Sequence, residues 1–533
     1  MDKKHGEYLA AQFVKGRISR REFIGRVGAL GLTAATTSGL ILSADKAIAE
    51  TPKKGGRLIL GWYAHSAKDT LNPNRLTTSL DFQRAYQTMG TLVRYAKDLS
   101  LEPDLATEWE SSDDATVWTF KIKTDAEFHN GKSLTVEDVI YSLNRHRGDD
   151  SDSIIKAWLD PITDIKKDGD DRIVVELSGP NGDLPFYFGD MHAAIVPDGF
   201  TDFNNAIGTG PYKLESFEPG VGMLASRFAN YYRDDVAHVD EVESFGIGDT
   251  PARMNALISG DVHFVTRCDP KLVDLINNAP GVTMAAAPGS RHITFPMMSD
   301  APPFDNNDLR LAIKYMADRQ GMVDNVLKGY GRVANDTPIG PFDKYFCEDI
   351  AQREYDPEKA MFHLKKAGME GQTLTLHTSE AAGGPPAPDL ALHLAESAKK
   401  IGFNIEVQRE PADGYWSSVW MKRPFHMSNW MPRPTADLRF SLVHLSDAKW
   451  NESHNGSAEL DALIIKARGM VDGPERAQVY CEIQRSIHET GGSLIPVFTD
   501  WLDARSETLK GWSAHPVGEG DGFRIHETAW LDT

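Results

Sequence analysis

The 533-residue sequence is poor in cysteine and lacks the short motifs of common metal proteins. Cys268, Cys347 and Cys481 are its only cysteines, too few for a disulfide-built scaffold. At most one disulfide can form, and the sequence leaves its pairing open. Cys481 lies in an apolar helical pattern and is expected to be a small buried residue. Because no C-x-x-C pair and no histidine pair at ligand spacing occurs, we expect no protein-built metal site.

The glycine motifs of cofactor-binding and hydrolytic enzymes are missing as well. No G-x-G-x-x-G and no G-x-S-x-G occurs, and the segment Gly208–Tyr212 has too few spaced glycines to hold a phosphate. We therefore expect no cofactor. Basic residues are outnumbered, with 57 Lys and Arg against 77 Asp and Glu. This acidity argues against nucleic acid as a partner, although simple solubility also explains it.

Long apolar runs are absent, and the apolar segment Val27–Leu42 is too short and too rich in small residues to span a bilayer. It follows Arg20-Arg21, in a segment that resembles the twin-arginine export motif, and it precedes Ala47-Ile48-Ala49, a small-x-small cleavage site. We predict that residues 1–49 are a cleaved signal peptide and that the mature protein is periplasmic. Cleavage removes eight basic and four acidic residues, which changes the net charge from −20 to −24.

The segment Trp118–Leu143 contains a strand, a turn and a helix in immediate succession. Apolar and polar residues alternate from Trp118 to Lys123, which is typical of a half-buried strand. Asn130-Gly131 provides the positive φ of a tight turn. Thr135 with Asp138 three residues later forms a capping-box pattern, so a helix with one apolar face is predicted from there.

This segment resembles the signature of the ABC-transporter substrate-binding proteins of family 5, which capture peptides, opines and nickel complexes. Its residues Trp-Thr-Phe, Phe-His-Asn-Gly and Thr-x-Glu-Asp-Val carry the resemblance. Three further segments agree and follow in the family's order: Gly208–Leu214 with Phe217–Gly220, Pro303–Ile313, and Tyr355–Gly368. Each alone is weak, whereas four in the family's order are specific and cover most of the chain from about Gly55.

The resemblance implies an α/β, two-lobed periplasmic-binding-protein fold of type II, in its large three-domain form, with a hinge between the lobes. In the first lobe, residues 50–91, 206–295 and 491–533 would form domain I, and residues 92–205 would form domain II. Residues 296–490 would form domain III, the second lobe. Strands predicted at Gly289–Ser299 and Leu494–Phe498 would cross between the lobes.

The second half of the sequence contains a strand–helix–strand pattern. It predicts a strand over Gln372–His377, a helix over Asp389–Ile401 and a strand over Asn404–Gln408, which together form an α/β unit. The proline-rich stretch Gly383–Pro388 reads as a loop. A long helix is expected over Pro474–Glu489.

A solute receptor needs an apolar or aromatic cleft with a few fixed polar groups. The richest candidate segment contains Tyr415, Trp416, Trp430, Arg433 and Asp437. Trp416 and Trp420, four residues apart, could equally pack in a core. Trp430 instead precedes Pro432 and Pro434, which favour a loop and therefore a binding role.

Arg433 indicates the ligand's charge. Peptide-binding members of the family often have, after the matching tryptophan, an acidic segment whose Asp takes the peptide's amino terminus. The third residue after Trp430 is here Arg433, and a guanidinium suits a carboxylate or phosphate. This departure puts ordinary peptide capture in doubt and favours an opine, a modified amino acid or a phosphorylated sugar.

The family's cleft border suggests further candidates. Tyr63, His65 and Asp81 lie in the first strand-to-helix region, and Arg291 lies on the predicted crossing strand. A lone histidine such as His65 is more often a hydrogen-bonded surface residue. The adjacent acids Glu137-Asp138 are those that the first turn of a helix favours and do not indicate catalysis.

We therefore predict a non-enzymatic, monomeric receptor that binds a peptide-like, opine-like or other anionic solute and docks on the transmembrane subunits of an ABC permease. A twin-arginine-exported periplasmic enzyme is the alternative of a different class, because that route often carries proteins folded around a cofactor. A receptor for a nickel or heme-type complex is a further alternative.

Overall fold

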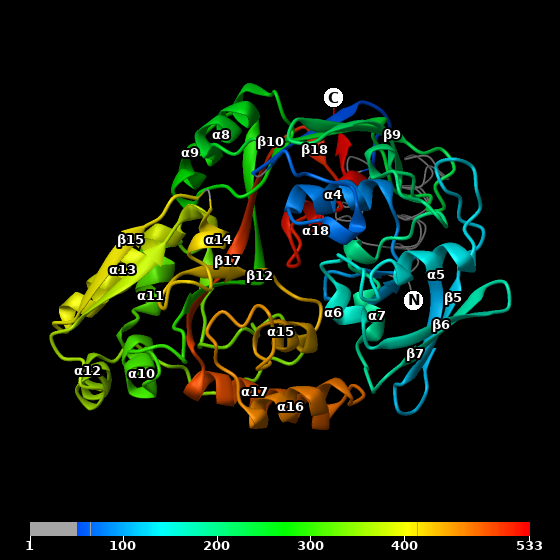
Figure 1. Ribbon diagram of the computed structural model, residues 1–533. Coiled ribbons are helices and arrows are strands. Elements are labelled where there is room, and N and C mark those ends of the chain that lie inside the picture. Colours follow the sequence, from blue (N-terminus) through cyan, green and yellow to red (C-terminus); the bar gives the residue numbers. More distant parts are fainter. Residues whose placement is uncertain (1–50, 64, 413, 533) are drawn as a thin grey trace, which may run out of the picture.

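The computed structural model describes residues 51–63, 65–412 and 414–532, so the predicted signal peptide lies outside the described residues. The chain forms two lobes, joined by two long antiparallel strands that run through the middle of the molecule (Figure 1). This confirms the predicted α/β two-lobed fold. Within the described ranges, no helix is long and apolar enough to cross a membrane.

A nine-stranded mixed sheet is shared by both lobes. Its strand order is β16-β12-β17-β11-β1-β10-β9-β8, and β13 also pairs with β17. The strands are β1 (Arg57–Trp62), β8 (Tyr212–Glu218), β9 (Gly222–Arg227), β10 (Glu241–Gly246), β11 (Phe264–Val265), β12 (Val282–Pro296), β13 (Gly331–Val333), β16 (Ser428–Trp430) and β17 (Ser493–Ser506).

The two crossing strands, β12 and β17, pair from Val282↔Ser506 to Pro296↔Ser493. Both are almost wholly buried where they enter the second lobe. Their register shifts between Ala287 and Arg291, next to Gly289, so the ladder is irregular near the middle of the crossing. The crossing strands that the sequence predicted are therefore present, and both are longer than predicted.

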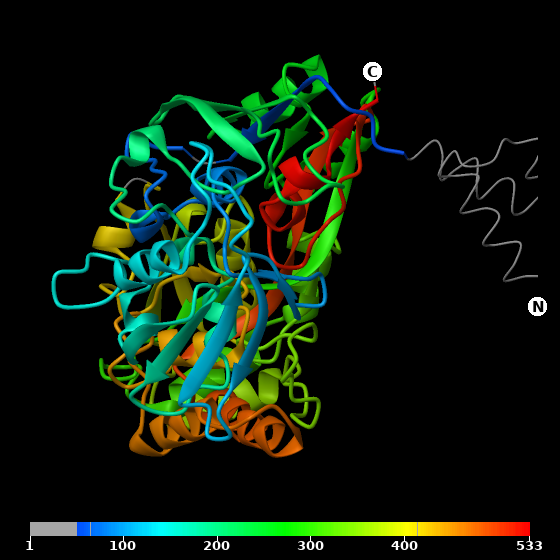
Figure 2. The same ribbon diagram turned by 90° about the vertical axis from the view of Figure 1, so that its right-hand side faces the viewer.

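The signature segment builds the core of a four-stranded antiparallel sheet in the first lobe. The sheet has the order β4-β5-β7-β6, and its strands face the viewer in Figure 2. Trp118, Phe120 and the helix residues Val136 and Val139 are buried together. The predicted capping box of Thr135 and Asp138 is present at the start of helix α5. The elements are β4 (Ala106–Ser111), β5 (Val117–Ile122), α5 (Val136–Asn144), α6 (Lys156–Leu159), β6 (Ile162–Asp168), β7 (Arg172–Leu177) and α7 (Leu184–Tyr187).

Short helices cover the rest of the first lobe. Helix α4 begins with a capping box in which Thr78 and Asp81 satisfy each other's backbone N–H groups. The remaining elements of this lobe are β2 (Val93–Tyr95), β3 (Leu101–Pro103), α4 (Ser79–Thr88), α8 (Thr250–Ser259), α9 (Val273–Asn277), β18 (Leu509–Lys510), α18 (Glu519–Gly522), α19 (Ile525–Thr528) and β19 (Trp530–Leu531).

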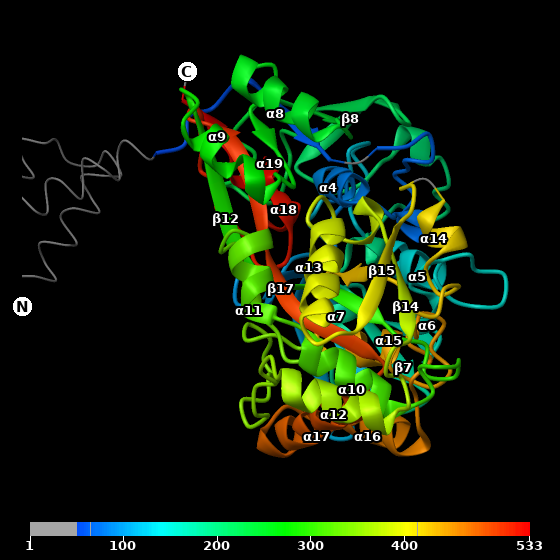
Figure 3. The ribbon, with the colours of Figure 1, turned by 90° about the vertical axis from the view of Figure 1, so that its left-hand side faces the viewer.

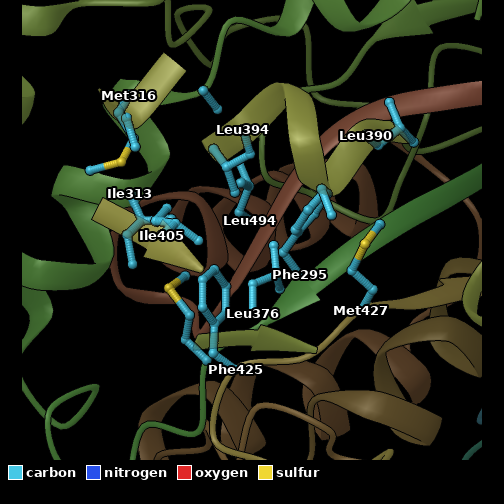
Figure 4. Packing of buried hydrophobic residues seen from close by; sticks show 14 of the residues in the cluster. Phe295, Ile313, Met316, Leu376, Leu390, Leu394, Ile405, Phe425, Met427 and Leu494 are labelled. Atoms are coloured by element: carbon cyan, nitrogen blue, oxygen red, sulfur yellow. The ribbon is translucent and has the colours of Figure 1, made fainter. Parts of the chain in front are cut away.

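The second lobe contains the predicted strand–helix–strand unit, in which β14 and β15 pair in parallel and α13 packs against them (Figure 3). Its apolar core includes Phe295 and Leu494 from the crossing strands (Figure 4). The expected loop at Gly383–Pro388 is too long, because α13 already begins at Ala387 with Pro388 in its first turn. The elements are α10 (Asn307–Met316), α11 (Arg319–Gly321), α12 (Pro357–Lys366), β14 (Thr373–Thr378), α13 (Ala387–Lys400), β15 (Asn404–Arg409), α14 (Tyr415–Ser418), α15 (Ala436–Val443), α16 (Ala458–Arg468) and α17 (Pro474–Thr490).

A buried ion-pair network ties the second lobe together. The Asp336 carboxylate accepts hydrogen bonds from Arg319 Nη2 at 2.9 and 3.0 Å and from Arg353 Nη1, and it also accepts from the backbone N–H of Ile495 on β17. The side chains of Asp336, Arg319 and Arg353 are at most 4% exposed. This network joins the segment from Arg319 to Arg353 to the crossing strand β17, which is distant in sequence.

One disulfide links Cys347 to Cys481 of helix α17, and Cys268 is free and buried. The expectation that Cys481 is a small buried apolar residue is therefore wrong, because its sulfur is bonded and the residue is only half-buried. The helical pattern around it was read correctly, but a pattern in one segment carries no information about a partner 134 residues away.

Removing this disulfide should destabilise the second lobe. The bond closes a long loop, and the entropy that it removes from the unfolded chain is worth about 2–4 kcal/mol. We expect Cys481→Ser to lower the free energy of unfolding by about that amount, measured by urea denaturation of the oxidised protein. Cys268→Ser serves as the single-thiol control, and an unchanged Cys481→Ser midpoint would contradict the expectation.

Candidate ligand-binding cleft

The two lobes face each other near the middle of the molecule, where aromatic side chains and arginines from both lobes meet. Trp430 and Met431 lie at the end of β16, and Trp501 lies on β17. The Arg267 guanidinium of the first lobe lies 3.8 Å from the ring centre of Tyr63 and 5.9 Å from that of Trp501. Aromatic planes beside a few polar groups are what a small-molecule site requires.

Arg267 connects the lobes at this point. It forms an ion pair with the buried Glu519 of α18, and its Nη2 lies 3.7 Å from the sulfur of Met431 in the second lobe. Its charge is therefore already balanced within the first lobe. Arg267 can shape the cleft, but the other cleft arginines are more available to a ligand.

Arg291, on the crossing strand β12, is almost fully buried and has no carboxylate partner among the described residues. It donates to Thr499 Oγ1 at 3.2 Å and to the carbonyl oxygen of Gly383 at 2.8 Å. Its guanidinium also lies 5.6 Å from the ring centre of Trp501. Burial, with the nearby Arg267 charge, lowers the pKa of Arg291 to about 9. A nearby anion would reverse this shift.

Arg439, on helix α15, is a second buried arginine without a carboxylate in ion-pair contact in the described part of the chain. It donates to the Met431 carbonyl oxygen and lies 5.1 Å from the ring centre of Trp430, while its Nη1 has no hydrogen-bond partner. Burial, with the nearby Arg433, lowers the pKa of Arg439 to about 9. The Nη1 group is thus a free, desolvated donor.

Arg433 is half-buried in the loop between β16 and α15. Among the described residues it forms no ion pair, and its Nε has no hydrogen-bond partner. Burial lowers the pKa of Arg433, and the charge of Asp190 in the first lobe opposes the shift. Asp190 itself is hydrogen-bonded to His192 at 2.5 Å. Arg433 therefore reaches toward the first lobe without being neutralised by it.

A small cavity lies beneath Trp430, lined in part by His292, Thr294, Arg439, His444 and Glu452. Glu452 is buried and accepts hydrogen bonds from Thr294 Oγ1 at 2.7 Å and from the indole N–H of Trp430 at 2.9 Å. Burial lowers the pKa of His444 to about 3, so this imidazole is neutral at pH 7. The positive charge at the cavity is therefore that of Arg439.

The structure gives the remaining first-lobe candidates hydrogen-bond partners outside this cluster. The Asp81 carboxylate is buried at the start of α4 and accepts the backbone N–H groups of Thr70, Thr77 and Thr78. His65 is exposed, with its Nδ1 at 3.1 Å from the Gly220 carbonyl oxygen. Both side chains have structural partners, and only Tyr63 of this group meets a cleft arginine.

The second-lobe candidates divide between core, surface and junction. Tyr415 is buried and donates to the Met427 carbonyl oxygen at 2.8 Å, whereas Trp416 is 45% exposed and packs edge-on against Trp420. The sequence predicted a loop at Trp430, but Trp430 is the last residue of strand β16 and pairs with His292 of β12. Asp437 is fully buried on α15 and accepts from Tyr187 and Arg468.

Sequence reasoning missed Arg267, Arg439, Glu452 and His444. None lies in a recognisable motif. Arg267 and Glu452 contact residues distant in sequence, Glu519 and Thr294, whereas Arg439 contacts Met431 only eight residues away. The sequence shows only an arginine two residues after Asp437, and its lack of an ion pair appears in the structure alone.

Comparison with known proteins agrees with the fold and the signature. Residues 100–452 match the family model "Bacterial extracellular solute-binding proteins, family 5 Middle". The probable D,D-dipeptide-binding periplasmic protein DdpA of Escherichia coli K12 is 23% identical over 523 residues, covering 91% of this chain and 96% of that protein. The oligopeptide-binding protein AppA of Bacillus subtilis is 25% identical over 542 residues, covering 94% and 96%.

Solved structures show the same fold. The periplasmic binding protein AgaA of A. tumefaciens R10, in complex with agropinic acid, has a TM-score of 0.78 at 22% identity, covering 90% of this chain and 99% of that one. DppA of Helicobacter pylori, in complex with the peptide STSA, has a TM-score of 0.78 at 21% identity with the same coverage. The family model spans more than half of the sequence. The chain therefore belongs to family 5 of the bacterial extracellular solute-binding proteins.

Proposed function

We propose that this protein captures an anionic small molecule, of the opine, modified amino acid or phosphorylated sugar type, between its two lobes. It acts as the periplasmic solute-binding component of an ABC importer and delivers the solute to the transmembrane subunits of the permease. Family membership supports the role, and relatives whose names indicate peptide and opine binding support the size of the ligand.

The observation that carries the anionic ligand is the set of cleft arginines without carboxylate partners among the described residues. Arg291, Arg433 and Arg439 are buried or half-buried, and each retains a nitrogen atom without a hydrogen-bond partner. A buried cation without a counter-charge is costly unless a ligand supplies that charge. The aromatic rings of Trp430 and Trp501 lie against Arg439 and Arg291 and hold these guanidinium groups in place.

Native mass spectrometry of the protein purified from the periplasm tests this proposal. We expect an added mass that is lost on denaturation and that fragments as a carboxylate- or phosphate-bearing molecule. Isothermal titration with the identified compound then gives its affinity. A bound species carrying only positive charge, or a neutral peptide that binds more tightly than any anion, would contradict the anionic ligand.

Arg433→Ala should weaken ligand binding by roughly 10- to 150-fold, because a charge-assisted hydrogen bond is worth about 1.5–3 kcal/mol. Arg433→Lys should recover only part of the affinity, since a point charge replaces a planar fork. The stability of the ligand-free protein should barely change. Calorimetry on both variants checks this, with the exposed Arg423→Ala as the control. A large loss of ligand-free stability at unchanged affinity would make Arg433 a structural residue.

Export through the twin-arginine route belongs to the same proposal. Replacing Arg20 and Arg21 by Lys should hold the precursor in the cytoplasm, because the route requires the arginine pair. Immunoblots of periplasmic and cytoplasmic fractions measure this, and the control changes Lys3 and Lys4 to Arg. Unchanged periplasmic yield would count against the route.

We also propose the three-domain division, with residues 50–91, 206–295 and 491–533 as domain I, residues 92–205 as domain II and residues 296–490 as domain III. Separate apolar clusters in the large sheet, the four-stranded sheet and the second lobe support a division into three units. The cluster borders differ from these limits at Phe295 and Leu494, which pack in the second lobe, and at Val196, which packs with the large sheet. The irregularity of β12 between Ala287 and Arg291 supports a hinge between the lobes.

A further inference from the structure

The lobes meet a second time, away from the crossing strands. The loop that precedes α7, in the unit built on the four-stranded sheet, lies against helices α15, α16 and α17 of the second lobe, as the positions of these helices in Figure 1 indicate. The proposed function assigns no role to this junction. It is built from hydrogen bonds, an ion pair and one close backbone approach.

The ion pair at the junction is bidentate and buried. Arg476 Nη1 and Nη2 each lie 2.8 Å from one oxygen of the Asp183 carboxylate, and the two side chains are 2% and 5% exposed. Arg476 Nε donates to the Ala467 carbonyl oxygen at 2.9 Å within its own lobe. Separating the lobes would leave each of these charges without its partner and would require it to be solvated.

The backbones of the two lobes touch at Gly182. Its N–H donates to the carbonyl oxygen of Arg468 at 3.2 Å. A Cβ atom at this position would lie 2.9 Å from the carbonyl oxygen of Met470, which is closer than such atoms can pack. Only glycine allows this approach, and both residues that it meets belong to the other lobe.

The loop around Gly182 is held rigidly on its own side. The Asn181 N–H donates to the Ala115 carbonyl oxygen at 3.0 Å, and the indole N–H of Trp118 donates to the Asn181 carbonyl oxygen at 3.1 Å. Trp118 belongs to β5 of the signature segment. The loop is therefore presented to the second lobe in a fixed position.

The junction is also connected to the cleft. The Tyr187 hydroxyl donates to Asp437 on α15 at 3.1 Å, and Asp437 is held by Arg468 Nε at 3.1 Å. Leu438 of α15 packs into the apolar cluster of the four-stranded sheet. Because α15 begins three residues after Arg433, a change at the junction displaces the loop that carries this cleft arginine.

We propose that the contact of Gly182, Asp183 and Tyr187 with Arg468, Arg476 and Asp437 is an interlobe latch. It holds the lobes closed and fixes the Arg433 loop across the cleft, so closure is stabilised by the protein itself and not by the ligand alone. Helices α7, α15 and α16 of the latch lie to the right of β12 and β17 in Figure 1, and breaking the latch frees the lobes to turn about these strands.

Gly182→Ala tests the latch with a matched control in the same loop. The added methyl group collides only with the other lobe, whereas at Gly179 a Cβ atom meets nothing within 4 Å. Mature wild type, Gly182→Ala and Gly179→Ala are compared without added ligand by small-angle X-ray scattering. Amide hydrogen exchange of a peptide containing residue 182 is measured on the same samples.

We expect Gly182→Ala to have a larger radius of gyration than wild type and amide exchange at the junction that is at least about tenfold faster. Gly179→Ala should match wild type in both measurements. Asp183→Asn leaves Arg476 without its carboxylate partner and should likewise increase the radius of gyration and the exchange rate. This variant replaces Gly182→Ala in the test if Gly182→Ala does not fold. Asp69→Asn breaks a buried ion pair with Arg84 inside the first lobe and should leave the radius of gyration unchanged. Identical scattering of folded Asp183→Asn and wild type, or an already open wild type, would overturn the latch. Neither result depends on which ligand the cleft binds.

Discussion

Asp336→Asn should lower the free energy of unfolding by about 3–5 kcal/mol, because it leaves two buried guanidinium groups without their counter-charge. The carboxylate contacts both Arg319 and Arg353 and is fully buried. It also accepts the backbone N–H of Ile495 on the crossing strand β17, so its loss affects the strand that joins the lobes. Urea denaturation followed by circular dichroism measures the change.

The same network predicts how stability depends on pH. Burial opposes ionisation of Asp336, but Arg319 and Arg353 outweigh it and hold the pKa of this carboxyl well below its ordinary value. A group with a lowered folded-state pKa stabilises the fold above its unfolded pKa, near 4, and loses this effect as pH falls below that value. The difference in free energy of unfolding between wild type and Asp336→Asn should therefore be largest at pH 6 and decrease steadily below about pH 4.

The exposed pair of Lys166 and Glu176 provides the control for this prediction. Its side chains are 51% and 39% exposed, so solvent screens the interaction. Glu176→Gln should leave the unfolding midpoint essentially where it is at both pH values. If the stability difference between wild type and Asp336→Asn increases as the pH falls, the stabilising charge belongs to another group.

Arg439→Met should abolish most of the ligand affinity without destabilising the ligand-free protein. We expect the affinity to fall roughly 10- to 150-fold, because a charge-assisted hydrogen bond is worth about 1.5–3 kcal/mol. Methionine keeps the packing over Trp430 and removes a buried cation that has no carboxylate in ion-pair contact among the described residues. Stability without ligand should therefore stay the same or rise, which is the usual sign of a site residue.

Arg253 is the matched control for this experiment. It is equally buried, but its guanidinium donates to four backbone carbonyl groups, including those of Thr266, Ile247 and Arg267. Arg253→Met should therefore lower stability and leave affinity nearly intact. If Arg439→Met unfolds as readily as Arg253→Met while still binding the ligand, Arg439 is a structural residue. Thermal unfolding with and without the ligand, together with calorimetry, separates the two cases.

Local sequence patterns predicted much of the fold. The alternation at Trp118 and the capping box at Thr135 both specify structures whose hydrogen bonds close within a few residues, and both are present. The crossing strands were found because their apolar runs coincide with the family's motif order. Their length and their irregularity near Gly289 depend on the pairing of distant segments and were not readable.

The cleft was predictable only in part, for the same reason. Trp430, Arg433, Tyr63 and Arg291 were named from motif position, and the structure brings all four to the region between the lobes. Asp81 caps helix α4, which a carboxylate near a predicted cleft can equally do, and its role at the cleft stays a prediction.

The latch lay wholly outside the reach of a local pattern. Asp183 and Arg476 are 293 residues apart, and no periodicity relates them. Gly182 is one glycine among 45, and its role appears only where a second backbone approaches it. Contacts between lobes depend on how the folded lobes pack against each other, and periodicity in the sequence carries no information about this packing.

Strand β12 ends at Pro296 and strand β17 begins at Ser493, and these two residues are cross-strand partners in one ladder. Paired residues of antiparallel strands lie about 5 Å apart, so the chain departs and returns at almost the same point. The two ends of the polypeptide between these positions are therefore adjacent in space. Exchanging this polypeptide for the equivalent stretch of a relative requires no new linker. The exchange would replace Trp430, Arg433 and Arg439 together, while Tyr63, Arg267 and Arg291 stay in place.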